Sequence, residues 1–218
     1  VVLILVSVSV TQISSEKVAR ATELTCAEGG VCVLGDIGPG GGKVFYVAPT
    51  TFASPGSDSY PGSDCDDACK YLEVAPGSAQ RTLRWASTSN QSRSVADNAT
   101  NTAIGTGMAN TIKIANQSGN TSTDSAAVYA YEYQGGGKED WHLPSFEEIR
   151  QLFTNQSRVE SGLKDFWWSS SESSSTNARR KHLLRTNGGE GTASKSGANH
   201  MRPVRAFASV PTLTVTYS

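Results

Sequence analysis

The stretch EDWHLPSFEEIRQLF, residues 139–153, fixes a helix start more firmly than any other part of this chain. Ser145 and Glu148 match the capping box, in which the serine accepts a hydrogen bond from a backbone N–H and the glutamate reaches back to the cap. Pro144 restricts the chain immediately before the helix. The stretch therefore predicts an amphipathic helix, and its apolar stripe comprises Ile149, Leu152 and Phe153.

The same stretch holds acid–base side chains, so catalysis is the competing interpretation. Asp140, His142 and Glu147 carry the groups that such chemistry uses. We expect architecture instead: Asp140 satisfies backbone donors within its own turn, and Trp141 anchors the core. Glu148 acts mainly as a cap, and His142 is exposed or half-exposed.

Apolar periodicity predicts two further helices and several strands around this stretch. Residues 104–116 place Met108, Ile112 and Ala115 on one helical face. Residues 124–133 offer closely spaced alanines for another helix, packed through Ala126, Ala127 and Ala130. Strand patterns occupy residues 43–48, 70–76, 83–87, 166–173, 178–186 and 200–208, with NGGEG at 187–191 as a hairpin turn.

The cysteines form two close pairs, Cys26 with Cys32 and Cys65 with Cys69, and none lies in the last two thirds of the chain. Four cysteines allow three connectivities, of which the two local pairings are favoured. A zinc site is the alternative, but the two-residue spacing of a zinc knuckle and a nearby histidine are both missing. Disulfides indicate an oxidising compartment, and each short loop contributes about 2–3 kcal/mol.

The chain ends differ in character from the middle. Residues 1–24 begin with VVLILVSVSV, which favours a terminal strand, while a pilin-like helical stem through SSEKVARATEL is the open alternative. A signal peptide needs a positively charged start and a membrane helix needs about 20 apolar residues, so membrane contact is expected only if this segment is an anchor. Residues 209–218 indicate a linker with one more strand, which leaves 25–208 as the main domain.

Two loops resemble ligand-binding loops, but the sequence of each argues against that function. The glycine-rich turn GPGGGK resembles a phosphate loop, but Ile37 and Val44 break that pattern and a strand follows. The acidic loop offers Asp64, Asp66 and Asp67 to calcium, but the EF-hand spacing is missing, so a solvated loop is favoured and no cofactor is expected. The 19 basic and 20 acidic residues nearly cancel, which excludes a general nucleic-acid binder.

Six motifs occur in the order that is typical of one family: GPGGGKVFYV, IGTGMANT, the helix with Ala126 and Ala127, DWHLPSFEEIRQLF, WWSSSE and RPVRAF. Together they resemble the Lcl-type domain, the C-terminal module of collagen-like bacterial adhesins, over residues 31–208. Members typically carry a DWYLPS turn, a YWSSSE strand and a final RPVRAF. The structural motif residues are Asp140, Trp141, Pro144, Ser145, Glu148, Arg202, Pro203 and Arg205.

The resemblance implies an α+β, C-type-lectin-like fold with two or three helices packed on short antiparallel sheets, related to the formylglycine-generating enzymes. It also implies a non-enzymatic, extracellular module on the cell surface that binds a host or matrix glycan or protein. The sequence departs from the family pattern in its acidic cystine insertion, in His142 at a usually aromatic position and in its N-terminal segment. Formylglycine-generating activity would need a pair of cysteines in the C-terminal half, and none follows Cys69.

Two binding hypotheses follow. An adhesion module would use the loop region SSSESSSTNARRKH, whose basic run suits sulfates or carboxylates. Trp167 and Trp168 point to opposite faces, so one belongs to the core and the other, for which Trp168 is the candidate, is a stacking platform or packs under a loop. Strand alternation sends Arg179 and Lys181 to one face and the other two basic side chains to the opposite face, so a half-buried strand is the alternative. The second hypothesis is a subunit of a surface filament or pilus, because an exposed apolar N-terminal strand needs a covering partner, including another copy. The candidate ligand-binding residues are Trp168, Glu172, Arg179, Arg180, Lys181 and His182.

Glycosylation is a candidate modification if the host glycosylates Asn-X-Ser/Thr sequons. In a chain rich in serine and threonine some sequons arise by chance, so occupancy is left open. The sequon asparagines are Asn90, Asn98, Asn116, Asn120 and Asn155.

Overall fold

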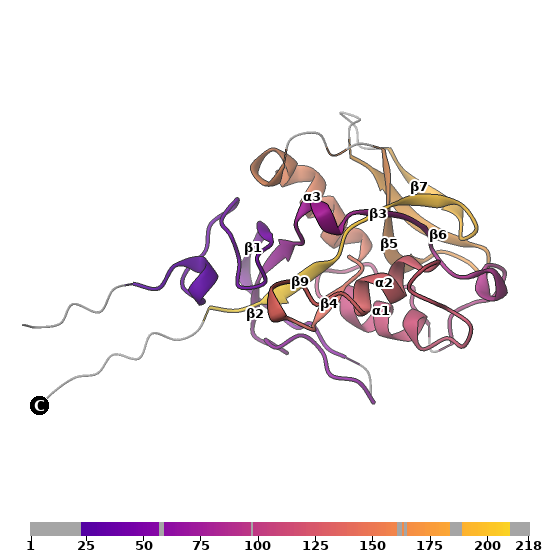
Figure 1. Cartoon of the computed structure of the whole chain (residues 1–218), viewed down its shortest axis with the longest axis horizontal. Coiled ribbons are helices and arrows are strands. Elements are labelled where there is room, and N and C mark those ends of the chain that lie inside the picture. Colours follow the sequence, from indigo (N-terminus) through magenta and orange to yellow (C-terminus); the bar gives the residue numbers. More distant parts are fainter. Residues whose placement is uncertain are drawn as a thin grey trace, which may run out of the picture.

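The computed structural model describes residues 23–56, 59–96, 98–160, 163, 165–183 and 189–209 (Figure 1). The predicted N-terminal strand or stem lies outside these residues apart from Glu23 and Leu24, and the predicted C-terminal strand lies outside them apart from Ser209. Within the described part, the chain forms two β-sheets and three α-helices, so the predicted α+β class is confirmed.

The first sheet has four strands in the order β1-β2-β9-β4, and every neighbouring pair is antiparallel. The pairing of β1 with β2 shifts in register between Val44 and Tyr46 and again between Val47 and Phe52. The central strands come from distant parts of the sequence, so this sheet ties the two ends of the domain together. Its strands are β1 (Lys43–Phe52), β2 (Cys69–Val74), β4 (Trp141–His142) and β9 (Val204–Phe207).

The second sheet has five strands in the order β3-β8-β5-β6-β7, antiparallel except where β5 lies beside β8. Strands β6 and β7 pair in antiparallel register; of the predicted turn at 187–191, Glu190 and Gly191 belong to β7, and residues 187 and 188 lie outside the described residues. In Figure 1 this sheet lies at the far side of the molecule from β1. Its strands are β3 (Arg81–Arg84), β5 (Phe166–Glu172), β6 (Asn177–His182), β7 (Glu190–Ser194) and β8 (Ala198–Met201).

The last predicted strand, residues 200–208, is two strands in different sheets. The chain leaves the second sheet after Met201 and enters the first sheet at Val204. Pro203 interrupts the run because proline has no N–H to donate to a ladder, although its carbonyl still accepts from Ala75 N at 2.9 Å. The prediction of one continuous strand was wrong for that reason, and the break joins the two sheets.

The three helices lie where periodicity predicts them, and they connect the sheets. Helix α3 packs on β1 of the first sheet and on β5 and β6 of the second. Helices α1 and α2 pack against each other, with α1 on β5 and α2 on β3 and β4. The α-helices are α1 (Gly107–Ala115), α2 (Ala126–Tyr131) and α3 (Phe146–Val159), and the short 3₁₀ helices are η1 (Cys26–Glu28), η2 (Gly77–Ala79), η3 (Thr88–Asn90) and η4 (Gly135–Gly137).

Strand β5 separates the two largest apolar clusters of the core. Trp167 belongs to the cluster between α3 and the first sheet, together with Phe45 and Leu152. Trp168 belongs to the cluster beneath α1 and α2, together with Ile114. Successive strand residues point to opposite faces, so these adjacent tryptophans fill both clusters from one strand.

Candidate functional site

Arg205 on β9 is the centre of a buried ion cluster. Sheet register places it beside Glu73 of β2 and Trp141 of β4, and only 2% of its side chain is exposed. Its Nη1 donates to Glu73 Oε1 at 3.2 Å, and its Nη2 donates to Asp64 Oδ2 at 2.9 Å. Its Nε donates to Asp140 Oδ1. All three guanidinium nitrogens therefore bind carboxylates.

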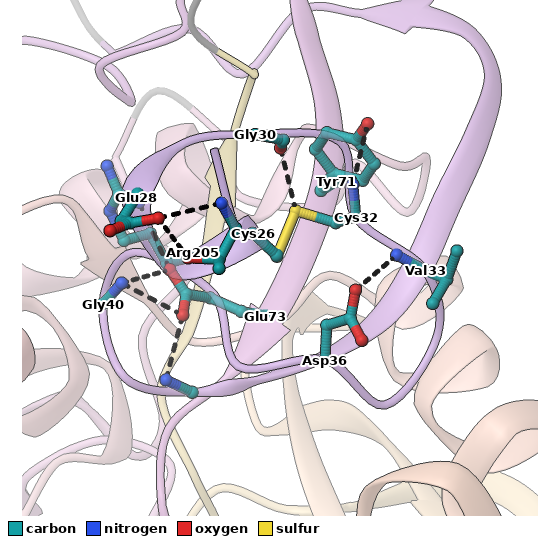
Figure 2. The surroundings of a disulfide bond; sticks show 12 residues. Cys26, Glu28, Gly30, Cys32, Val33, Asp36, Gly40, Tyr71, Glu73 and Arg205 are labelled. Atoms are coloured by element: carbon teal, nitrogen blue, oxygen red, sulfur yellow. Dashed lines mark hydrogen bonds and ion pairs between the residues drawn. A yellow bond between two sulfur atoms is a disulfide. The ribbon is translucent and has the colours of Figure 1, made fainter. Parts of the chain in front are cut away.

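The glycine-rich turn at residues 38–42 holds Glu73 from its other side (Figure 2). Gly40 N donates to Glu73 Oε1 at 3.0 Å, and Gly42 N donates to Glu73 Oε2 at 3.0 Å. A Cβ on Gly40 would lie 2.8 Å from Glu73 Oε1 and 2.6 Å from the Trp141 ring, so only glycine fits. The turn reverses the chain into β1, as predicted, and it also satisfies a buried carboxylate.

The environment shifts the pKa values of both partners. Burial raises the pKa of Glu73 above its ordinary value of 4.5, while Arg205 and the N–H groups of Gly40 and Gly42 act in the opposite direction. Burial also acts to lower the pKa of Arg205, but Asp140 and Glu73 outweigh burial, and the net shift is upward. The guanidinium therefore keeps its charge, and the Glu73 carboxyl retains a proton to a higher pH than an exposed glutamate does.

Glu73 is a site residue that the sequence pattern does not reveal. The pattern KYLEVAP assigns it to a strand, and the one available signal is a charge between Leu72 and Val74, both of which are buried. Its partners lie 33 residues away at Gly40 and 132 residues away at Arg205. No local periodicity spans those separations.

An open cavity of about 500 Å³ lies beside the ion cluster, bordered by both cystine loops, and we name it the disulfide-end cavity. Arg205 and Asp64 reach its wall from the ion cluster, and Lys138 Nζ lies 3.8 Å from Asp64 Oδ2. Glu28 adds a second carboxylate, whose pKa is lowered by the hydrogen bond from the Thr25 backbone N–H. Two carboxylates and two cations therefore line the cavity, and its apolar wall comprises Pro39 and Phe207.

The cysteines form the two predicted disulfides, Cys26 with Cys32 and Cys65 with Cys69. Disulfides of this kind persist in oxidising compartments. Among the described residues, no group of three or more His, Cys, Asp or Glu side chains is arranged to hold a metal ion. Asp64, one of the three acidic residues considered for calcium, binds Arg205 instead.

Asp140 has a different role from the predicted one. It bonds no donor of its own turn in the described structure; its Oδ1 accepts from Arg205, and its Oδ2 accepts from the backbone N–H of Asp64 at 3.0 Å. The prediction was wrong because the donor lies 76 residues away, in the acidic cystine loop. Asp140 therefore fastens that loop to the first sheet.

His142 is fully buried, so the prediction that it is exposed was wrong. It lies on β4, enclosed by β9 on one side and by α1 and α2 on the other. Its Nε2 lies 3.3 Å from Glu148 Oε2. Glu148 also accepts from Ser145 N at 2.8 Å and from Gly105 N at 2.8 Å, so the capping box is confirmed and extended to a second loop.

Trp168 and Glu172 are buried and do not offer a ligand-binding surface. Trp168 Nε1 donates to Leu83 O at 3.0 Å, and its ring lies inside the core, so the predicted stacking platform is wrong. Glu172 accepts from Val95 N at 3.0 Å and pairs with the buried Lys195. Both side chains are buried because helices α1 and α3 pack on β5.

The basic run at residues 179–182 does not form one patch, as strand alternation predicts. Arg179 and Lys181 lie over aromatic rings of α3, at 5.5 Å from Phe146 and 4.2 Å from Phe153. On the opposite face, Arg180 lies 3.7 Å from the Phe166 ring centroid, and His182 lies 4.7 Å from the same ring. Lys181 also donates to Glu190 at 3.0 Å. The run is occupied by contacts within the fold.

The remaining motif residues also form contacts within the fold. Trp141 is fully buried and donates from Nε1 to Gly135 O at 3.0 Å. Pro144 O accepts from Ser170 N at 2.7 Å. Arg202 donates to Glu160 at 2.6 Å and to Gln80 at 2.8 Å. Arg202 and Pro144 contact distant parts of the chain, whereas Trp141 is bonded to η4, six residues before it.

The five sequons differ in accessibility. Asn90 is buried, and its Nδ2 donates to Ser118 O at 3.0 Å. The Nδ2 groups of Asn120 and Asn155 donate to Ile114 O at 2.8 Å and to Phe45 O at 3.0 Å. The exposed sequon asparagines are Asn98 and Asn116.

Comparison with protein-family models and with curated protein sequences finds no match to this chain. Within the described ranges, no helix combines the length and apolar character that crossing a bilayer requires.

Proposed function

We propose that this chain is an extracellular, non-enzymatic binding module of the C-type-lectin-like class, similar to the Lcl-type domains, and that it binds a neutral glycan in the disulfide-end cavity. The site lies at the cystine loops instead of the basic run on β6. The cell surface is the proposed location, and a matrix or host glycan is the proposed partner.

The fold supports the class. Two sheets bridged by three helices agree with the arrangement that the family resemblance implies. The family-like motifs supply buried contacts: the capping box holds α3, and Arg205 of RPVRAF holds the ion cluster. The motif residues therefore maintain the fold, and the loops are left free to bind a ligand.

The disulfides support an extracellular location, since such bonds persist outside the reducing cytosol. They also argue against cysteine chemistry, because all four thiols are paired. His142 lies inside the core, where a substrate cannot reach it. The formylglycine-generating alternative therefore has no support among the described residues.

The observation that carries the proposal is the composition of the cavity lining. Glu28 and Asp64 offer carboxylate acceptors, and Lys138 offers a donor, beside the apolar wall of Phe207. Vicinal sugar hydroxyls both donate and accept, and sugar C–H faces pack on apolar walls, so this mixture suits a polyhydroxyl ligand. The lining charges cancel, and Arg205 already binds buried carboxylates, so an anionic ligand is disfavoured.

An array of neutral and sulfated oligosaccharides, followed by calorimetric titration of the best binder, tests this proposal. Lys138→Ala removes a cavity donor whose side chain is 34% exposed, and we expect affinity to fall about tenfold, which is about 1.4 kcal/mol. Arg179→Ala, in the basic run, is the matched control and should bind as the parent chain does. Preference for sulfated ligands, with loss in Arg179→Ala only, would overturn the cavity assignment.

A second candidate function is a subunit of a surface filament. Leu24, Val31, Val33 and Ile37 are exposed apolar side chains that gather in the N-terminal part of the described chain, directly after residues 1–22. Exposed apolar patches favour a covering partner. Removal of residues 1–15 should convert a filament into monomers, as seen by electron microscopy and light scattering. Identical assembly states with and without those residues would exclude this function.

A further inference from the structure

Three of the four sheet edges are covered or interrupted within the described chain. The outer edge of β1 is covered in its first half, where Gly35 N donates to Val44 O at 2.8 Å and Val44 N donates to Asp36 O at 2.9 Å. Its second half carries Pro49 and an irregular register before Phe52. Both are devices that prevent a further strand from pairing.

The edges at β4 and β3 are covered by the helical region. Beside β4, Leu143 N donates to Thr111 Oγ1 of α1 at 3.0 Å. Beside β3, Arg84 forms a β-bridge with Ser125, just before α2. Leu83 O of β3 also accepts from Trp168 Nε1 at 3.0 Å, so other parts of the described chain already contact both edges.

Strand β7 is the remaining edge, and its register shows which backbone groups point outward. His182 N donates to Gly189 O at 2.9 Å, and Lys195 N donates to Thr176 O at 2.9 Å. Antiparallel ladders alternate, so Gly191 and Ala193 turn their backbone groups toward β6. Glu190, Thr192 and Ser194 turn theirs away from the sheet.

This edge lacks the usual protective devices. The strand EGTAS has neither proline nor lysine, and all of it is exposed except the half-buried Ala193. The carboxylate of Glu190 is paired with Lys181 at 3.0 Å and with Arg150 at 3.1 Å, so its charge is balanced from within. By the register of β6 and β7, the backbone N–H and C=O of Thr192 point away from β6.

We propose that β7 pairs with β7 of a second copy of this chain, antiparallel about a two-fold axis at Thr192. Thr192 then faces the partner's Thr192, a favourable cross-strand pair. Glu190 faces the partner's Ser194, so the two glutamates lie at opposite ends and do not repel each other. A parallel arrangement would place Glu190 beside the partner's Glu190. Because these two carboxylates would repel each other, the antiparallel arrangement is favoured.

The pairing joins the two five-stranded sheets into one continuous sheet. Each outward-facing residue exchanges both of its backbone hydrogen bonds with its partner. Strands of five residues bury less than the roughly 1,200 Å² of a standard stable interface, so the dimer is weak and depends on concentration.

The dimer has a consequence for ligand binding. This consequence rests on the proposed function, whereas the pairing of the β7 strands does not. Strand β7 lies at the opposite end of the molecule from β1 and η1, where the disulfide-end cavity opens (Figure 1). A two-fold axis at β7 therefore points the two cavities away from each other. Such a dimer links two glycan-bearing partners that lie at its opposite ends, and it does not place both cavities on one flat surface.

Cross-linking tests the geometry directly. In the proposed pair the Cα atoms at position 192 lie about 5.5 Å apart, within the range of about 4.4–6.8 Å that a disulfide spans. Thr192→Cys should form a covalent dimer under mild oxidation on a non-reducing gel. Thr51→Cys, also at an exposed position but on β1, should remain a monomer. Equal cross-linking of the two variants would overturn the proposal.

Sedimentation velocity supplies the independent measurement on the full chain. The parent sedimentation coefficient should rise with protein concentration, and Thr192→Lys should abolish the rise because two lysines would face each other. Thr51→Lys carries the same added charge and should behave as the parent does. A parent chain that is monomeric up to millimolar concentration overturns the dimer and leaves the β7 edge to an extended peptide of another protein. Thermal unfolding of each variant verifies that it is folded.

Discussion

At the scale of single residues, the fold depends on charged side chains whose partners cannot be identified from the sequence. Arg205 is enclosed by Glu73, Asp140 and Asp64, which come from β2, from the turn before β4 and from the acidic loop. A buried cation with several carboxylates is not a large net source of stability, but each member needs the others. Removing one member leaves uncompensated charge in the interior.

Arg205→Ala should therefore lower the free energy of unfolding by about 3–5 kcal/mol, because Glu73 and Asp140 remain buried without a cation. Denaturant titration measures the loss. Arg84→Ala is the control: its ion pair with Asp124 is 47% exposed on the arginine side, and such pairs contribute less than about 1 kcal/mol. Equal losses in the two variants would show that Glu73 and Asp140 do not depend on Arg205 for the stability of the folded state.

Glu73 should make stability depend on pH. Burial raises its pKa in the folded chain above 4.5, so the folded state binds this proton more tightly than the unfolded state does. The resulting stabilisation is complete below pH 4.5 and is lost as the pH rises through the raised pKa. Glu73→Gln does not titrate, so urea titrations between pH 4 and 8 should show the parent gaining on the variant as the pH falls. A difference that is constant or reversed would contradict the assigned shift.

At the scale of elements, the sequence predicts features whose causes are local. The capping box at Ser145, the helical stripes and the two short cystine loops each depend on residues within a few positions of one another. Asp140 and His142 were mispredicted because their surroundings come from distant segments. The division of residues 200–208 between two sheets was missed because one strand was assigned across Pro203, which has no N–H to continue a ladder.

Helix α3 offers a direct test of the cap. Ser145 Oγ accepts from Glu148 N at 3.3 Å and donates to Ala103 O at 2.8 Å, so Ser145→Ala removes a cap and a link to a loop. We expect a loss of about 1–2 kcal/mol in the free energy of unfolding. Ser157→Ala, exposed near the end of the same helix, should change it by less than about 0.5 kcal/mol. A loss no larger than that control would mean the cap is dispensable.

At the scale of the whole molecule, the two ends have different characters. The end with β1, η1 and β9 carries both disulfides, the ion cluster and the disulfide-end cavity. The other end presents the open edge of β7. The cavity could not be predicted from sequence, since its lining residues come from separate segments between Ala27 and Ser209. The basic run was a stronger sequence signal, yet the fold occupies it with aromatic contacts.

Surface accessibility predicts which sequons carry glycans on a folded, secreted product. In a glycosylating host, Asn98 and Asn116 should be occupied, because they are exposed. Asn90 should be unoccupied, because its amide is buried and bonded. Mass spectrometry of glycopeptides measures occupancy at each site. A folded product with glycan at Asn90 would contradict the packing around η3.

The location of ligand binding is the central claim, and mapping backbone amide shifts by nuclear magnetic resonance tests it most directly. The isotope-labelled chain is titrated with the neutral oligosaccharide that binds best on the array. Our account predicts shift changes at Glu28, Asp64, Lys138 and Phe207, with the signals of residues 179–182 unchanged. Changes confined to residues 179–182, or none at the cavity under saturating ligand, would contradict it.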